Sequence, residues 1–133
     1  MNLKPERVFH YFRELSDIPR ESHNEKAVSD YIYNFGKKLG LETKQDDILN
    51  VYMRKPATKW YENKPGIILQ GHMDMVCEKA TSSKHNFATD KIEWVIKDDL
   101  LFANKTTLGA DDGIAVAMAM AILEDETLIH PEL

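Results

Sequence analysis

The 133-residue sequence has almost no cysteine, no long apolar run and no cluster of basic residues. Its single cysteine, Cys77, cannot form an internal disulfide, which excludes a disulfide-stapled secreted scaffold and fits a reducing cytoplasm. No apolar run approaches the roughly 20 residues of a membrane span, and the first residues lack the apolar segment of a secretory signal. The net charge of −5 argues against a nucleic-acid surface. We therefore expect a cytoplasmic protein without membrane or nucleic-acid partners.

Hydrophobic residues make up 43% of the chain, enough to bury a core, and the length fits one domain or part of one. Apolar residues at spacings of three and four predict a helix over 4–15. The capping-box pattern of Ser22 and Glu25 predicts a second helix, which should end before a left-handed Gly40. Two hairpins are also predicted, with strands at 42–45 and 50–54 and at 92–96 and 100–103.

The stretch 66–76 is the first candidate for a functional site. A turn signal at Gly66 is followed by three apolar residues, which predicts a central strand over 66–72 that is buried on both faces. His72 and Asp74 come where this strand should end, and their spacing puts both side chains on one side. Imidazole and carboxylate are common zinc ligands, so the pattern predicts a metal site, although a His-x-Asp tripeptide by itself is a weak signal.

A second acidic site lies downstream, at Asp111 and Asp112. A helix over about 112–123 should follow, and because it is apolar on all sides it should be buried. Asp112 could cap this helix, and Asp111 would then lie at a buried helix N-terminus, where the dipole stabilises an anion. The alternative is that both carboxylates merely cap the helix.

The predicted strand 66–72 and the helix 112–123 are not followed by another strand. A crossover helix should return to a parallel neighbour, and Leu133 is about where that strand would start. We therefore expect that the chain is truncated.

Four motifs give the sequence a family resemblance. They are Ser-Asp-Ile-Pro-Arg at 16–20, Arg-Lys-Pro-Ala-Thr at 54–58, Leu-Gln-Gly-His-Met-Asp-Met-Val at 69–76, and Thr-Thr-Leu-Gly-Ala-Asp-Asp-Gly at 106–113. Through them the chain resembles, over essentially its whole length, the bacterial aminoacyl-histidine (Xaa-His) dipeptidases of the M20 metallopeptidase family. The resemblance implies an α/β fold, a mixed-sheet α/β/α sandwich of the zinc-exopeptidase type, here in truncated form.

The resemblance also implies a hydrolase that uses two zinc ions to cleave dipeptides, with Xaa-His the expected substrate. His72 matches a ligand of one zinc, and Asp111 matches the carboxylate that bridges both. Asp74 matches the family's active-site aspartate, which orients the ligand histidine. The Glu-Glu pair that supplies the family's general base and a further ligand has no counterpart in this sequence.

Residues 1–133 therefore correspond to the N-terminal part of the family's catalytic domain, without its lid domain. We expect the chain alone to be inactive and the full-length protein to form a homodimer through the missing lid. A related M20 tripeptidase or acylase remains an alternative, as does a non-catalytic protein that keeps the fold for partner binding.

Overall fold

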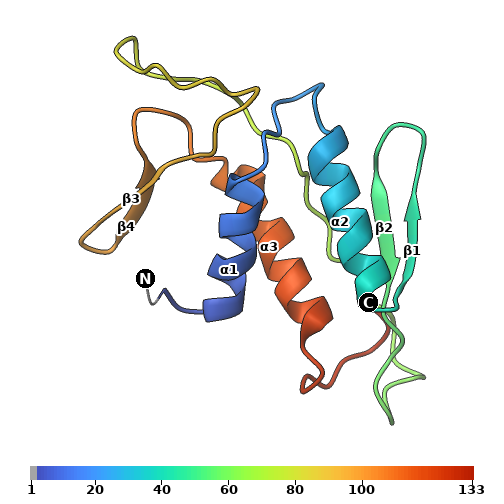
Figure 1. Cartoon of the computed structure of the whole chain (residues 1–133). Helices are drawn as coiled ribbons and strands as arrows, with labels where there is room; N and C mark the ends of the chain where they lie inside the picture. The colour runs from blue at the N-terminus through green and yellow to red at the C-terminus, as the bar shows by residue number, and fades with distance from the viewer. Residues whose placement is uncertain (1–2) are drawn as a thin grey trace.

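The computed structural model describes residues 3–133 and contains three helices and four short strands. Figure 1 shows their arrangement. In chain order they are α1 (Glu6–Ser16), α2 (Lys26–Lys38), β1 (Glu42–Gln45), β2 (Val51–Arg54), β3 (Trp94–Lys97), β4 (Leu100–Ala103) and α3 (Ala110–Glu124).

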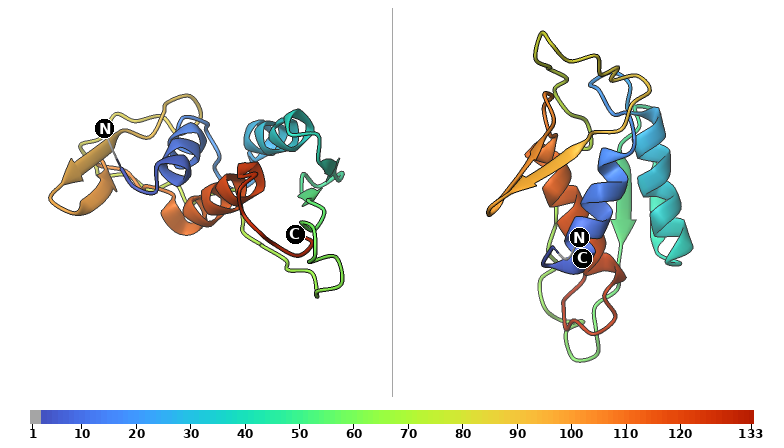
Figure 2. Two further views of the ribbon diagram at one scale, coloured as in Figure 1. Left: turned by 90° about the horizontal axis from the view of Figure 1, so that it is seen from below. Right: turned by 60° about the vertical axis from the view of Figure 1, so that its left-hand side comes forward.

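The core lies between α1, α2 and α3. Helix α1 packs along α3, while α2 packs on the β1–β2 hairpin, as both views in Figure 2 show. The predicted apolar stripe of α1 is confirmed, since Val8, Phe12 and Leu15 are all buried. The core cluster is completed by buried residues of the same three helices: Tyr11, Val28, Ile32, Ala117 and Met120.

The start of α2 differs from the predicted capping box. The helix begins after Glu25 with no side-chain cap, because the Ser22 hydroxyl donates instead to Asp74 Oδ2 at 2.5 Å. The end of α2 is as predicted. Gly40 has φ +73°, and the N–H of Leu41 donates to the carbonyl of Gly36, which is the Schellman arrangement.

Both predicted hairpins are confirmed, as two separate two-stranded antiparallel sheets. β1 pairs with β2 so that Glu42 lies opposite Arg54, and β3 pairs with β4 so that Trp94 lies opposite Ala103. The second hairpin is tied to α1, since Trp94 Nε1 donates to Ser16 Oγ at 3.0 Å.

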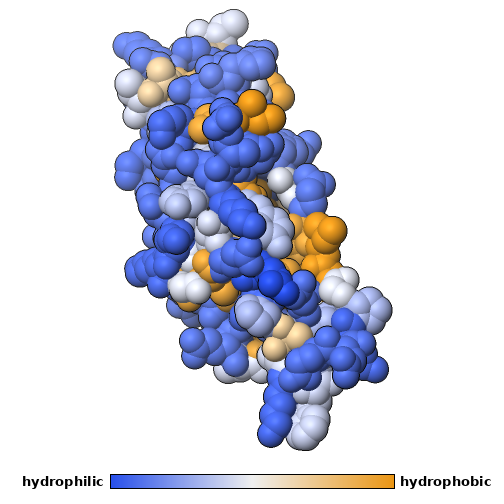
Figure 3. All heavy atoms as spheres, turned by 90° about the vertical axis from the view of Figure 1, so that its right-hand side faces the viewer, coloured by the Kyte–Doolittle hydropathy of each residue, from blue (hydrophilic) through white to orange (hydrophobic). Residues whose placement is uncertain are grey.

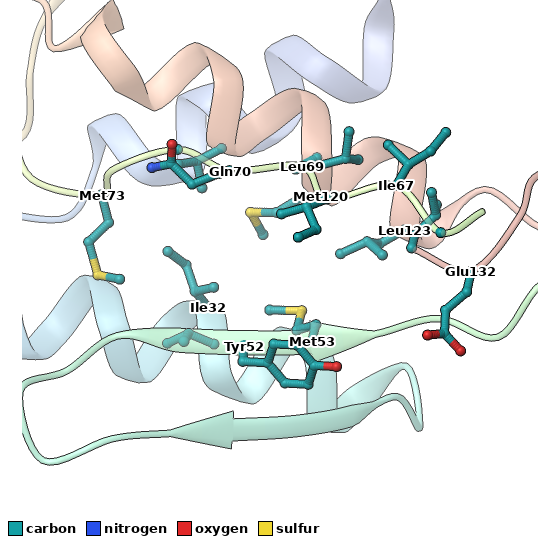
Figure 4. Close-up of a pocket in the computed structure, with 17 residues that line it drawn as sticks. Ile32, Tyr52, Met53, Ile67, Leu69, Gln70, Met73, Met120, Leu123 and Glu132 are labelled. Carbon is teal, nitrogen blue, oxygen red and sulfur yellow. The ribbon is translucent and has the colours of Figure 1, made fainter.

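The predicted central strand over 66–72 is wrong for the described residues. This segment has no regular secondary structure, and Ile68 is 91% exposed. A strand requires hydrogen-bonded neighbours on its edges, and here a groove of about 610 Å³ separates the segment from β2. Figure 4 shows the two walls, with Leu69 and Met120 on one side and Met53 on the other.

One end of this groove is closed by the last residues of the chain. Leu133 exchanges two main-chain hydrogen bonds with Lys55, and the carbonyl of Glu132 accepts from the N–H of Ile67. Leu133 therefore forms an antiparallel pair beyond the end of β2, while Glu132 pairs with the 66–71 segment. At this end of the groove, Leu133 pairs with Lys55 on one side and Glu132 pairs with Ile67 on the other. Within residues 3–133, the mixed sheet that we predicted consists here of these two residue pairs and does not extend further.

Helix α3 confirms the predicted helix but not its complete burial. Ala117 and Met120 are buried against the core, whereas Met118 is 48% exposed because no element among the described residues covers its face. Asp111 and Asp112 depart from helical backbone angles at its start.

None of the helices in residues 3–133 is long and apolar enough to cross a membrane. The face shown in Figure 3 is mostly hydrophilic, with apolar residues gathered in separate patches.

Candidate metal centre

The candidate site forms where the 66–72 segment passes the start of α3. Gly71 permits this approach, because a Cβ atom at that position would lie 2.9 Å from Asp112 Oδ2 and 3.4 Å from a methyl group of Val116. A side chain at position 71 would have to displace the Asp112 carboxylate, which accepts a hydrogen bond from the N–H of His72. Gly71 therefore lets the main chain pass close to the start of α3.

His72, Asp74 and Asp111 converge as predicted. The Nδ1 atom of His72 lies 3.0 Å from Asp74 Oδ1, and its Nε2 atom lies 3.0 Å from Asp111 Oδ1. One imidazole ring is therefore held between two carboxylates that are far apart in the sequence. This is the geometry in which a carboxylate on one nitrogen fixes the ring while the other nitrogen faces a ligand position.

The two carboxylates raise the pKa of His72. Partial burial by itself would lower this pKa, but the hydrogen bonds to Asp111 and Asp74 outweigh it. A neutral imidazole has only one N–H to donate, whereas imidazolium can donate to both carboxylates. Without a metal, the site therefore favours a protonated His72.

Ser22 is a site residue that the sequence reasoning missed. Its hydroxyl donates to Asp74, and this hydrogen bond is the largest cause of a lowered Asp74 pKa, ahead of the opposing effect of burial and the contribution of His72. Asp74 is thus held ionised in an orientation that presents its second oxygen to His72. The capping-box pattern around Ser22 concealed this role, and no signal in the sequence alone connects positions 22 and 74.

The two aspartates at the start of α3 differ from expectation. The side chain of Asp111 is 96% exposed, so the predicted buried anion is wrong for the described residues. Asp112 makes no side-chain cap, and its Oδ2 atom instead accepts from the N–H of His72 at 3.3 Å. The break in helical geometry at these two residues turns both carboxylates towards the 72–74 segment.

The donor set fits part of a metal site. Two ligand atoms of a tetrahedral zinc with bonds of roughly 2.0–2.1 Å are separated by about 3.3 Å, close to the 3.0 Å between His72 Nε2 and Asp111 Oδ1. Within residues 3–133, however, no three His, Cys, Asp or Glu side chains are grouped so that they could hold a metal ion. His72 and Asp111 could therefore supply two ligands of a metal site, but they do not form a complete ligand set by themselves.

Comparison with known proteins places this site in context. No family model matches the chain. The chain is 38% identical over 128 residues to the cytosol non-specific dipeptidase of Escherichia coli (strain K12), a match that covers 96% of this chain and 26% of that protein. The chain therefore spans about a quarter of the length of this curated relative.

Solved structures agree with the sequence match. The crystal structure of aminoacylhistidine dipeptidase from Vibrio alginolyticus matches with a TM-score of 0.95 and 36% identity, over 98% of this chain and 27% of that one. A tripeptidase from Staphylococcus aureus shares the fold, with a TM-score of 0.74 and 24% identity over 95% of this chain and 34% of that one. The predicted resemblance to aminoacyl-histidine dipeptidases and the predicted α/β peptidase fold class are confirmed.

Proposed function

From the likeness of this chain to part of an aminoacylhistidine dipeptidase, we propose that the full-length protein is a metal-dependent dipeptidase of the M20 type. It hydrolyses Xaa-His dipeptides in the cytoplasm. The sequence match to a cytosolic dipeptidase supports the enzyme class and the compartment, and the structural match to an aminoacylhistidine dipeptidase supports the substrate. The homodimer expected from the resemblance remains a prediction.

The position of His72 supports this proposal most directly. His72 Nε2 and Asp111 are the residues that would hold zinc, with Asp111 shared between two ions, and Asp74 on Nδ1 would keep the ring in the ligand orientation. Bound zinc would supply Lewis-acid polarisation of the peptide carbonyl and a water of lowered pKa. The remaining ligands and the general base would come from residues outside this chain.

Substitution of the three site residues in the full-length protein tests the proposal. His72→Ala and Asp111→Asn each remove a zinc ligand and should abolish Xaa-His hydrolysis together with binding of one or both metals. Asp74→Asn keeps both ligands and should lower metal affinity or activity by about 10–100-fold. Zinc binding is followed by calorimetry and hydrolysis by release of free histidine.

His10→Ala is the matched control, because His10 lies on the exposed surface of α1, where its ring pairs with Glu14 and not with the site residues. It should leave both zinc binding and turnover unchanged. If His72→Ala behaves like His10→Ala, the ligand assignment is wrong. Zinc and dipeptide binding without turnover in the unaltered protein would favour the non-catalytic alternative.

A further inference from the structure

Arg20 is the largest fully buried side chain, with 1% of its surface exposed. A charged residue is almost never buried to this degree without an oppositely charged partner. Within the described residues, all its hydrogen bonds go to main-chain carbonyls. The function proposed above assigns it no role.

The guanidinium group of Arg20 joins three segments. Its Nε atom donates to the carbonyl of Leu15 at the end of α1 at 3.3 Å. One terminal nitrogen donates to the carbonyl of Met73 at 3.0 Å, and the other donates to the carbonyl of Gly109 at 2.7 Å. Met73 lies between His72 and Asp74, and Gly109 is the N-cap of α3, two residues before Asp111.

Two glycines make the space for this group. A Cβ atom at Gly109 would lie 2.5 Å from a terminal nitrogen of Arg20, and a Cβ atom at Gly113 would lie 2.7 Å from the same nitrogen. Contacts this short are too close for any side chain. The guanidinium of Arg20 therefore occupies space that side chains at positions 109 and 113 would otherwise fill, which indicates that the guanidinium has a defined position at the start of α3.

Two of the three segments that Arg20 joins are irregular where the guanidinium contacts them. None of residues 66–74 lies in a strand, and the start of α3 departs from helical geometry. Other hydrogen bonds also connect the two stretches of chain. The N–H of His72 donates to Asp112 and the hydroxyl of Thr107 donates to the carbonyl of Val76, but both bonds are exposed. Main-chain bonds from Thr107 to Glu78 and from Ala80 to Lys105 lie farther along the chain from His72, among exposed or half-buried residues. The link through Arg20 is shielded from water, where hydrogen bonds to a charged donor are stronger.

We propose that Arg20 is a positioning residue whose buried guanidinium fork sets the distance between His72 and Asp111. The fork is needed because its two terminal nitrogens reach carbonyls on different segments at once. A lysine ammonium is a point charge on a flexible stem and cannot hold both in one plane. The functional meaning of this role rests on the proposed metal site, whereas the effect of Arg20 on the distance between His72 and Asp111 does not depend on a bound metal.

Arg20→Lys and Arg20→Gln in the full-length protein test the inference, with cobalt(II) as the probe metal. Both variants should weaken cobalt affinity by about 10–100-fold, as is typical when a residue that orients a ligand is lost, and should alter the visible absorption of the cobalt complex. In the metal-free protein at one fixed pH, both should shift the ring ¹⁵N resonances of His72. Arg20→Lys keeps charge and most of the volume, so it carries the test if Arg20→Gln does not fold.

Val28→Ala is the matched control, because Val28 is fully buried in the helical core on α2 and, unlike Arg20, donates no side-chain hydrogen bond to the 72–74 segment or to the start of α3. It should lower the melting temperature yet leave cobalt affinity, the cobalt spectrum and the His72 resonances unchanged. Unchanged affinity and resonances in Arg20→Lys would overturn the inference. Shifted resonances, in a protein whose cobalt binding does not depend on His72, would uphold the positioning role and overturn the proposed metal site.

Discussion

At the scale of single residues, the site is built around one imidazole ring with a carboxylate on each nitrogen. Asp74 is fixed by Ser22, whereas Asp111 is almost fully exposed. Asp74 is thus held by Ser22 as well as by His72, whereas the carboxylate of Asp111 contacts His72 and otherwise faces solvent. This asymmetry fits the roles that the resemblance implies for them.

The pKa of His72 should fall when Asp74 is replaced by Asn. The negative charge of Asp74 stabilises imidazolium, so its removal favours the neutral ring. In the metal-free protein the pKa of His72 is raised above its ordinary value of 6.5, and in Asp74→Asn it should lie closer to that value. NMR titration of the ring proton provides the measurement.

The sign of the linked stability follows from the raised pKa. The contribution of His72 to stability is fully present below the pH at which the unfolded imidazole titrates, and it is lost as pH rises through the pKa of His72 in the folded protein.

Asp90→Asn is the control for the Asp74→Asn titration, since Asp90 lies outside the site and accepts hydrogen bonds from Asn86 and Thr89. A His72 titration that is the same in both variants would contradict the prediction.

At the scale of elements, the 66–72 segment shows that an apolar run does not make a strand by itself. A strand is completed by a series of hydrogen bonds to a neighbouring strand. Among the described residues, this segment makes one main-chain hydrogen bond of that kind, from Ile67 to Glu132. The helices differ because their hydrogen bonds are internal to the segment. α1, α2 and most of α3 therefore form as the local pattern predicts.

Gly109 and Gly40 separate two reasons why a helix terminus requires glycine: the left-handed backbone conformation and the lack of space for a Cβ atom. Both have positive φ, +72° and +73°, but a Cβ at Gly40 would meet nothing within 4 Å. Gly40→Ala should cost about 1–2 kcal/mol, the penalty of the left-handed conformation. Gly109→Ala should cost a further ~1–3 kcal/mol, because its Cβ also collides with Arg20 and Met75.

Urea unfolding of the two variants beside the unaltered protein measures this difference. The two substitutions share chemistry and backbone conformation, so each is the control for the other. Equal losses of unfolding free energy would mean that the space around Gly109 relaxes freely, and that the guanidinium of Arg20 is not held in place.

At the scale of the whole molecule, residues 1–133 by themselves should neither hydrolyse Xaa-His dipeptides nor bind zinc tightly. Among the described residues, two of the proposed ligands converge, His72 and Asp111, whereas a catalytic zinc usually takes three from the protein. The absence of an oriented general base should alone lower the rate by about 10²–10⁴. The apolar groove beside β2 should also promote self-association.

Zinc calorimetry, a histidine-release assay and sedimentation velocity on the 133-residue chain, each beside the full-length protein, check these expectations. Tight binding of two zinc ions, or turnover near the full-length rate, would show that the ligands or the base lie elsewhere in the chain. A strictly monomeric chain at high concentration would show that the groove is not a self-association surface.

Part of the site could be predicted from the sequence because its motifs are local. His72 and Asp74 are two residues apart at the end of an apolar run, and Asp111 opens an apolar helix, so the residue types and their order indicated metal chemistry. Their roles as ligands remain predictions. Ser22 and Arg20 were not assigned to the site, because each acts through contacts with residues more than 50 positions away.

The sequence by itself determined the helices and hairpins, since their hydrogen bonds are satisfied within a segment or between neighbouring ones. Only the tertiary structure decided how His72 and Asp111 meet, because that depends on Gly71 passing close to α3 and on a buried Arg20. It also decided that Ile68 and Met118 are exposed, since burial requires a covering element that the described residues do not contain. Local patterns specify what a segment can form, whereas burial and convergence depend on partners distant in the sequence.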